Sequence, residues 1–278
     1  MPILSPTYIS TWYYMLDPNG LTRLFQSHKE KVINEVKPKL MLQGDIGTHV
    51  MSVGGIYHEI NIVSPAIIVE TSSSTQVTGV FDIIQESFNT LQSPTNVINA
   101  TYLMESATIQ ISKEGVNCTV KFVSDQGGAF TPVFGPPIDF IARTAMWYDC
   151  IFFASQSNLP EQFQVISATI NIKANINKEY FIGTDQSPYY CVSGYTIEGD
   201  LTILARPDQF AALSIPFQTP GELTTTGVSG TALSIGGISI AFGSLSLNTS
   251  VSGNLVAGEI TTADINFHTY ARYTTPIT

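Results

Sequence analysis

The chain has 278 residues, of which only 12% are charged, against roughly 25% in an average soluble domain. Its length suffices for one large or two ordinary domains, and its sparse charge indicates either Ser/Thr-rich β-strands or a surface partly covered by other subunits. The formal net charge of −10, with 12 scattered Lys and Arg, argues against a protein that grips nucleic acid, because phosphate binding needs clustered basic residues.

The N-terminal segment, residues 1–130, is expected to be β-rich with one amphipathic helix. Apolar residues at helical spacing over 21–36 predict that helix. A turn is expected at Gly54-Gly55, and alternation over 77–83 predicts a strand. The clearest unit is a hairpin over 107–122, where apolar and polar residues alternate on both sides of a Lys-Glu-Gly turn.

The next segment, residues 131–163, is expected to be a linker followed by a helix. Gly and Pro residues up to Pro137 punctuate the chain. Helical spacing that begins at Pro137 predicts a helix over 137–150. Residues 148–153 fit a strand equally well.

The last segment, residues 164–278, has the strongest β pattern. Even positions from 166 to 176 are apolar and odd positions are polar, which predicts a strand with one dry and one wet face. The alternation returns over 195–203, so we expect these two strands to pair. Twelve such residues span about 40 Å, a length that suits a barrel or an extended sheet. A Gly236-Gly237 pair predicts a kink within a later strand.

Motifs for catalysis, cofactors or metals are missing from the sequence. There is no nucleophile elbow, Walker loop, HExxH or EF-hand pattern, and the four histidines have no metal-ligand spacing. Glu198 and Asp200 lie about 7 Å apart on one strand face, a distance that does not exclude a glycosidase pair. Such acids usually come from different strands, so we interpret them as an acidic patch on a solvated or pore-facing sheet. We expect no enzyme, no cofactor and no metal.

Three cysteines, Cys118, Cys150 and Cys191, lie far apart and form no CxxC pair. Their odd number and apolar surroundings predict buried, reduced thiols in a protein made in a reducing compartment. No stretch approaches membrane-spanning length, so no membrane partner is expected.

The order of parts in the last 110 or so residues resembles the tail-tube proteins of bacteriophages and related contractile injection systems. The resemblance rests on the strand 166–177, the strand 194–203, a long Thr/Gly loop, a hairpin around Gly243 and the closing strand 258–267. It implies a mainly β fold, a tail-tube-like barrel or sandwich with one or two flanking helices. It also implies rings, generally hexameric, that stack through long loops into a β-lined channel for the genome.

On this resemblance, the chain is expected to be a structural subunit of a phage tail tube, located in the virion tail and, during assembly, in the host cytoplasm. Its partners would be further copies of itself, with sheath, tape-measure and baseplate proteins as further candidates, while DNA would pass without specific binding. An acidic balance suits such a pore. The candidate lumen-facing residues are polar side chains of the two long strands: Asn171, Lys173, Asn175, Glu198, Asp200 and Thr202.

The length leaves the architecture open, because a simple tube subunit is roughly half as long. In one interpretation, the first half is a diverged second copy of the tube domain, with the hairpin 107–122 opposite the one at 233–251. In the other, residues 1–160 are a decoration or a sheath-facing extension on a hexameric subunit. Three duplicated chains would still complete a sixfold-like ring.

Other classes of function stay open. The chain could be another structural virion protein, such as a baseplate ring, tail terminator or capsid decoration subunit. A carbohydrate- or cell-surface-binding β-sandwich would need exposed aromatic residues, for which Tyr189-Tyr190 is the best candidate. A β-rich hydrolase is disfavoured because no nucleophile constellation is present.

Overall fold

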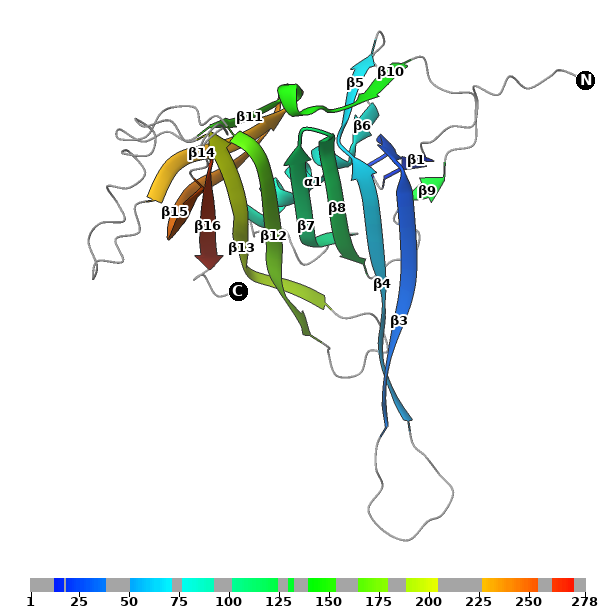
Figure 1. The fold of residues 1–278 in the computed structure, drawn as a ribbon. Helices are drawn as coiled ribbons and strands as arrows, with labels where there is room; N and C mark the ends of the chain where they lie inside the picture. The colour runs from blue at the N-terminus through cyan, green and yellow to red at the C-terminus, as the bar shows by residue number, and fades with distance from the viewer. Residues whose placement is uncertain are drawn as a thin grey trace, which may run out of the picture.

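The structure, a computed structural model, describes residues 13–17, 19–38, 51–71, 77–92, 102–124, 130–132, 140–153, 165–179, 189–204, 227–254 and 262–272. Over these ranges the fold is mainly β, as the sequence predicts, and it contains one α-helix (Figure 1). None of the sheets in the described ranges closes into a barrel.

Ten strands form the principal sheet, and every neighbouring pair in it is antiparallel. In spatial order they are β11 (Cys150–Phe153), β14 (Gly227–Ile235), β15 (Ile238–Asn254), β16 (Thr262–Arg272), β13 (Tyr189–Leu204), β12 (Val165–Glu179), β7 (Leu103–Ser112), β8 (Gly115–Ser124), β4 (Met51–Pro65) and β3 (Ser27–Pro38). The partnerships expected for the two long C-terminal strands and for the hairpin over 107–122 are confirmed. Figure 1 shows β3 and β4 extending as a long hairpin beyond the other strands.

Two smaller sheets flank the principal one. The first has the order β6 (Val77–Gly79), β2 (Thr22–Phe25), β1 (Tyr13–Leu16) and β9 (Thr131–Pro132). The second pairs β10 (Phe140–Thr144) with β5 (Ile67–Thr71).

Helix α1 (Val80–Gln92) packs on the dry face of the principal sheet, where it contacts β4, β7, β8, β13 and β15. Its buried side chains include Ile83, Ile84 and Leu91. Phe88 lies edge-on to Tyr195 of β13, with ring centroids 5.1 Å apart, and also contacts Phe242 of β15. The helix therefore joins strands from both halves of the chain in one core.

Strand β15 belongs to two layers. Its first half pairs with β14 and its second half, from Ser246 onward, pairs with β16. The first half lies against α1, where Gln92 Nε2 donates a hydrogen bond to the Ala241 carbonyl at 3.1 Å. Phe152 of β11 contacts Phe267 of β16. The layer of β11, β14 and the start of β15 thus covers the dry face of the C-terminal strands.

Both helix predictions made from the sequence are wrong. Residues 22–25 and 27–38 form β2 and β3, so the helical spacing over 21–36 came from two strands that meet at Gln26. All four residues of β2 are buried, whereas β3 carries exposed side chains in succession. In the segment 137–150, the described residues form β10, a 3₁₀ turn at Trp147–Asp149 and the start of β11. Pairing with β5 and β14 overrides the local spacing there.

The helix that does form begins inside the expected strand over 77–83. Only Val77–Gly79 is extended. The Asp82 carboxylate accepts a hydrogen bond from the Gly79 N–H at 2.9 Å, which is the acidic half of a capping box and starts the helix at Val80. The following apolar residues then have helical spacing.

The turns and bends predicted at glycines also differ from the structure. The turn expected at Gly54-Gly55 is wrong, because β4 runs through both residues. Gly236 and Gly237 have φ of +60° and +90° and form the tight turn between β14 and β15, where type I′ geometry requires positive φ. The hairpin expected around Gly243 is wrong, because β15 is continuous there.

Candidate functional site

A polar face covers the side of the principal sheet opposite α1. Along β4, β7, β8, β12 and β13, buried apolar residues alternate with exposed or half-buried polar ones, the pattern of a sheet with one solvated side. Seven neighbouring strands contribute to what we call the polar face: Asp264, Asn266 and His268 (β16); Thr196, Glu198, Asp200 and Thr202 (β13); Ser167, Thr169, Asn171, Lys173 and Asn175 (β12); Ser106, Thr108 and Gln110 (β7); Asn117, Thr119 and Lys121 (β8); Glu59 and Asn61 (β4); Ser27, Lys29 and Lys31 (β3).

Strand register arranges these residues in rows. One row consists of directly paired residues, His268, Glu198, Asn171, Thr108, Thr119, Val63 and Ser27. Directly opposite side chains have Cβ atoms about 4.5–5.5 Å apart, so neighbours in a row can touch. Thr108 Oγ1 and Asn171 Oδ1 are 2.9 Å apart, where the threonine hydroxyl donates across the boundary between β7 and β12. The polar face is therefore continuous across the two halves of the chain.

All six candidate residues from the sequence lie on this face. Asn171 is opposite Glu198, and Thr202 donates a hydrogen bond to Asp264 Oδ1 at 2.8 Å. Lys173, Glu198 and Asp200 are exposed, and the other three are half-buried. That this face lines a channel stays a prediction.

The apolar stripe of β12 departs from the expected pattern at its start. Ile166 is 44% exposed, because the register with β13 shifts between Val165 and Ser167. From Ala168 to Ala174 the even positions are buried as predicted.

Half of the polar face was missed by sequence reasoning. The contributions of β7 and β8 were visible in the alternation of their hairpin, but nothing placed them beside β12. The contribution of β3 was hidden, because His28 and Glu30 alternate with Lys29 and Lys31 and both sides of the strand are polar.

Charge is distributed unevenly over the polar face. Glu198, Asp200 and Asp264 gather on β13 and β16, whereas Lys29 and Lys31 stand exposed on β3. The acidic patch expected at Glu198 and Asp200 therefore exists. The face as a whole carries both signs, so the acidic balance of the chain is not spread evenly over it.

Lys121 lies between these regions and is held by two carboxylates. Its Nζ lies 2.6 Å from Glu105 Oε2 and 3.3 Å from Glu59 Oε1. Burial alone would lower the pKa of Lys121, but the hydrogen bonds to Glu105 and Glu59 outweigh burial and raise it. This lysine is neutralised locally and is poorly placed to bind a passing phosphate.

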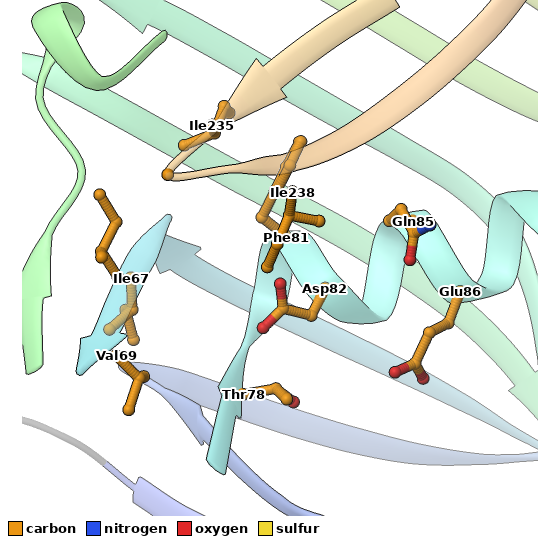
Figure 2. A pocket seen from close by; sticks show the side chains of 11 residues that line it. Ile67, Val69, Thr78, Phe81, Asp82, Gln85, Glu86, Ile235 and Ile238 are labelled. Atoms are coloured by element: carbon orange, nitrogen blue, oxygen red, sulfur yellow. The ribbon is translucent and has the colours of Figure 1, made fainter. Parts of the chain in front are cut away.

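A cavity of about 290 Å³ lies between β5, the start of α1 and the β14–β15 turn (Figure 2). Its walls are mostly apolar, and the polar side chains of Thr78, Asp82, Gln85 and Glu86 also line it. Burial raises the pKa of Asp82 to about 6. Asp82 caps α1 by accepting the hydrogen bond from the Gly79 N–H, so this carboxylate has a structural role. The other carboxylate that lines the cavity, Glu86, is paired with Arg23.

Arg23 forms a buried ion-pair network beside this cavity. Its Nη2 lies 2.6 Å from both Asp17 Oδ2 and Glu86 Oε2, and its Nη1 also donates to Thr78 Oγ1. Burial alone would lower the pKa of the Arg23 guanidinium, but the bonds to Glu86 and Asp17 outweigh it and raise the pKa. The network connects β2 to α1, so we assign it a structural role.

Metal and thiol chemistry finds little support in the described ranges. No group of three or more His, Cys, Asp or Glu among those residues could hold a metal ion. The three cysteines are free, with Cys118 buried and the other two half-buried. Burial raises the pKa of the Cys118 thiol, and it raises that of Cys150 to about 12, so neither is an activated nucleophile.

The histidines are dispersed. His28 packs between Phe25 and Phe130, where burial lowers its pKa. His58 Nδ1 lies 2.8 Å from Glu30 Oε1. His268 lies on the polar face, and His49 lies outside the described residues.

No helix among the described residues has both the length and the apolar character needed to span a membrane. A scan against protein-family models found no matching family, and a search of curated proteins found no related sequence.

Proposed function

We propose that this chain is a structural subunit of a bacteriophage-type tail tube, whose copies assemble into stacked rings around a channel for genome delivery. The observation that carries the proposal is the polar face, which runs through seven adjacent strands from both halves of the chain while the opposite face is packed. No described element covers the polar face. A sheet of this kind can serve as a wall between a packed protein layer and a water-filled lumen.

The chemistry of the polar face suits a surface that DNA must pass without adhering. Most of its side chains are hydroxyls and amides, and its acidic residues would repel phosphate over a screening length of about 8–10 Å. Of its lysines, Lys121 is paired with two glutamates. Specific or tight DNA binding would need a larger cluster of unpaired basic residues than Lys29 and Lys31 of β3.

The two longest paired strands of the second half set the height of the proposed wall. Strand β12 has 15 residues and β13 has 16, which at the usual rise is about 50 Å. The six candidate lumen residues lie along this height on the solvated side of both strands.

The main alternative is another ring-forming virion protein, such as a baseplate ring, tail terminator or capsid decoration subunit. The same polar face would serve it, and assembly behaviour distinguishes the two. Rings that close but never stack into tubes would favour this alternative.

A surface-binding β-sandwich is a second candidate, because the described residues include an exposed aromatic pair. Trp147 and Tyr148 are 56% and 61% exposed, with ring centroids 5.7 Å apart at 81°. This edge-to-face arrangement does not make a flat platform for a sugar ring. Tyr190, half of the pair expected from the sequence for this role, is buried and cannot contact a carbohydrate.

The proposal is tested by electron microscopy and sedimentation of the purified full chain at rising concentration. Tubes with a stain-filled channel are the expected product. A chain that stays monomeric at every concentration would contradict the proposal. Binding of oligosaccharides that quenches tryptophan fluorescence, without assembly, would favour the surface-binding candidate.

A further inference from the structure

We infer that the free edge of β3 pairs antiparallel with the second half of β15 in another copy of this chain, so that the β7–β12 junction inside each chain recurs between chains. The inference rests on the proposed function in that it concerns how the rings close. It commits to a second copy as the occupant of both edges.

The first support is a repeat in strand order. The first unit contains β3, β4, β7 and β8 in the spatial order β3-β4-β8-β7, and the second contains β12, β13, β15 and β16 in the order β12-β13-β16-β15. In each unit the first strand pairs with the second, the second with the fourth and the fourth with the third. The topological partner of the hairpin 107–122 is therefore β15–β16, not the hairpin 233–251 expected from the sequence.

The junction between the two units is a complete interface. The third strand of the first unit, β7, pairs antiparallel with the first strand of the second unit, β12. Buried Ile109 is opposite buried Ile170 on the dry side, and Thr108 bonds Asn171 on the polar side. Both faces of the sheet thus continue from one unit to the next without a break.

Strands β3 and β15 lie at the two ends of the repeat, where they could form a junction like that of β7 with β12 between two chains. Strand β3 pairs only with β4 among the described strands, and from Leu247 to Asn254 β15 pairs only with β16. Unpaired strand edges are templates for another chain. On β3, Val32 is 58% exposed although it is register-paired with a residue of the dry side, His58. An added strand beside β3 would cover it.

Charge favours a head-to-tail arrangement over a symmetric one. Lys29 and Lys31 near the β3 edge make no ion pair with any described residue, and at the other end Asp264 is one strand inward from β15. Pairing β3 with β3 would set these lysines against their own copies. Pairing β3 with β15 brings them toward Asp264, which lies one strand from that edge. Head-to-tail contacts generate rings when the rotation closes.

The stoichiometry follows from the repeat. Each chain supplies two four-strand units, so a six-unit ring of the kind that the tail-tube resemblance implies needs three chains. A hexamer of this chain would contain twelve units.

The first test reverses charge at the β3 edge. The double variant Lys29→Glu/Lys31→Glu should weaken association of the full chain at least tenfold in sedimentation velocity, and Asp264→Lys added to it should restore part of the loss. The matched control is Lys113→Glu at the exposed β7–β8 turn, which should associate like the native chain. Native-like association of the double variant, or equal weakening in the control, would overturn the inference.

The second test does not depend on the effect of any substitution. Hydrogen–deuterium exchange of assembled against dissociated native chain should show new protection over residues 27–33 and 247–254. Protection confined to the β11 edge, or none in these two segments, would overturn the inference. If both segments gain protection in rings that never stack into tubes, the edge pairing stands and the proposed function fails. If tubes form without this protection, the proposed function stands and the edge pairing fails.

Discussion

Ser27 on β3 and Ser246 on β15 lie in one register row that crosses the eight strands from β3 to β15. From Ser246 the row passes through His268, Glu198 and Asn171 into the first unit and ends at Val63 and Ser27. The row runs from the free edge of β3, through the candidate lumen residues Asn171 and Glu198, to the residue of β15 at which pairing changes from β14 to β16. A subunit built in this way presents one solvated surface from edge to edge, which is what a shared channel wall requires.

Charge reversal on the polar face should change genome transit but not assembly. Glu198 and Asp200 are exposed and make no ion pair with a described residue, so Glu198→Lys/Asp200→Lys should fold and form tubes like the native chain. The added lysines would attract phosphate, and ejection of DNA should slow severalfold, more at low salt than at high salt. Glu114→Lys at the exposed β7–β8 turn is the control. Unchanged ejection kinetics would count against a lumenal position.

Gly199 should tolerate no side chain. A Cβ at this position would lie 2.0 Å from the Thr169 carbonyl oxygen and 2.8 Å from Phe267 Cζ, so the β12–β13 backbone and the Phe267 ring would both have to move. We expect Gly199→Ala to lower the free energy of unfolding by about 3 kcal/mol or more. Thr196→Ala on the same strand should cost less than about 1 kcal/mol. Equal values in urea unfolding would show that the close approach is absent.

The buried Arg23 network should be far more sensitive than an exposed ion pair. Arg23→Ala leaves the Asp17 carboxylate buried without its guanidinium partner, which typically costs about 3–5 kcal/mol. Arg143→Ala removes a pair with Asp149 whose arginine is 42% exposed, and such pairs contribute about 0–1 kcal/mol. Thermal unfolding of the two variants measures the difference. A native-like melting temperature for Arg23→Ala would contradict the assigned network.

Asp82 should make stability fall as pH rises from about 4 to about 6. Burial raises the pKa of this carboxyl from 3.8 to about 6 in the folded chain, so in that window the folded state holds a proton that the unfolded state has released. The contribution is fully present below pH 3.8, is lost above pH 6 and is on the order of 1–3 kcal/mol. Asp82→Asn keeps an acceptor for the Gly79 N–H and should remove this part of the pH dependence. Parallel pH profiles for native chain and variant would refute it.

Sequence reasoning succeeded where a strand had one dry and one wet side. Ala168, Ile170 and Ile172 alternate with polar residues because β12 lies between a packed core and solvent, and β13 follows the same rule. The six candidate residues were therefore assigned to a common face without knowledge of the sheet.

It failed where pairing partners decide the structure. Val32 on β3 is exposed at a sheet edge, so its apolar character carried no information about a buried face. Leu24 and Phe25 are buried in a different, short strand, and the combined spacing imitated a helix. The alternation from Val77 to Ile83 predicts a strand, but the hydrogen bond from the Gly79 N–H to Asp82 caps a helix that begins at Val80. The junction of β7 with β12 joins residues about sixty positions apart, and no local pattern signals it.

The most direct test of the account is a cryo-electron-microscopy reconstruction of the particle that the full chain forms. The account predicts closed rings in which Asn171, Glu198 and their row neighbours face an open central channel and β3 of one copy adjoins β15 of the next. A particle whose polar face is covered by another layer, or turned to the outside around a channel lined by other residues, would contradict it.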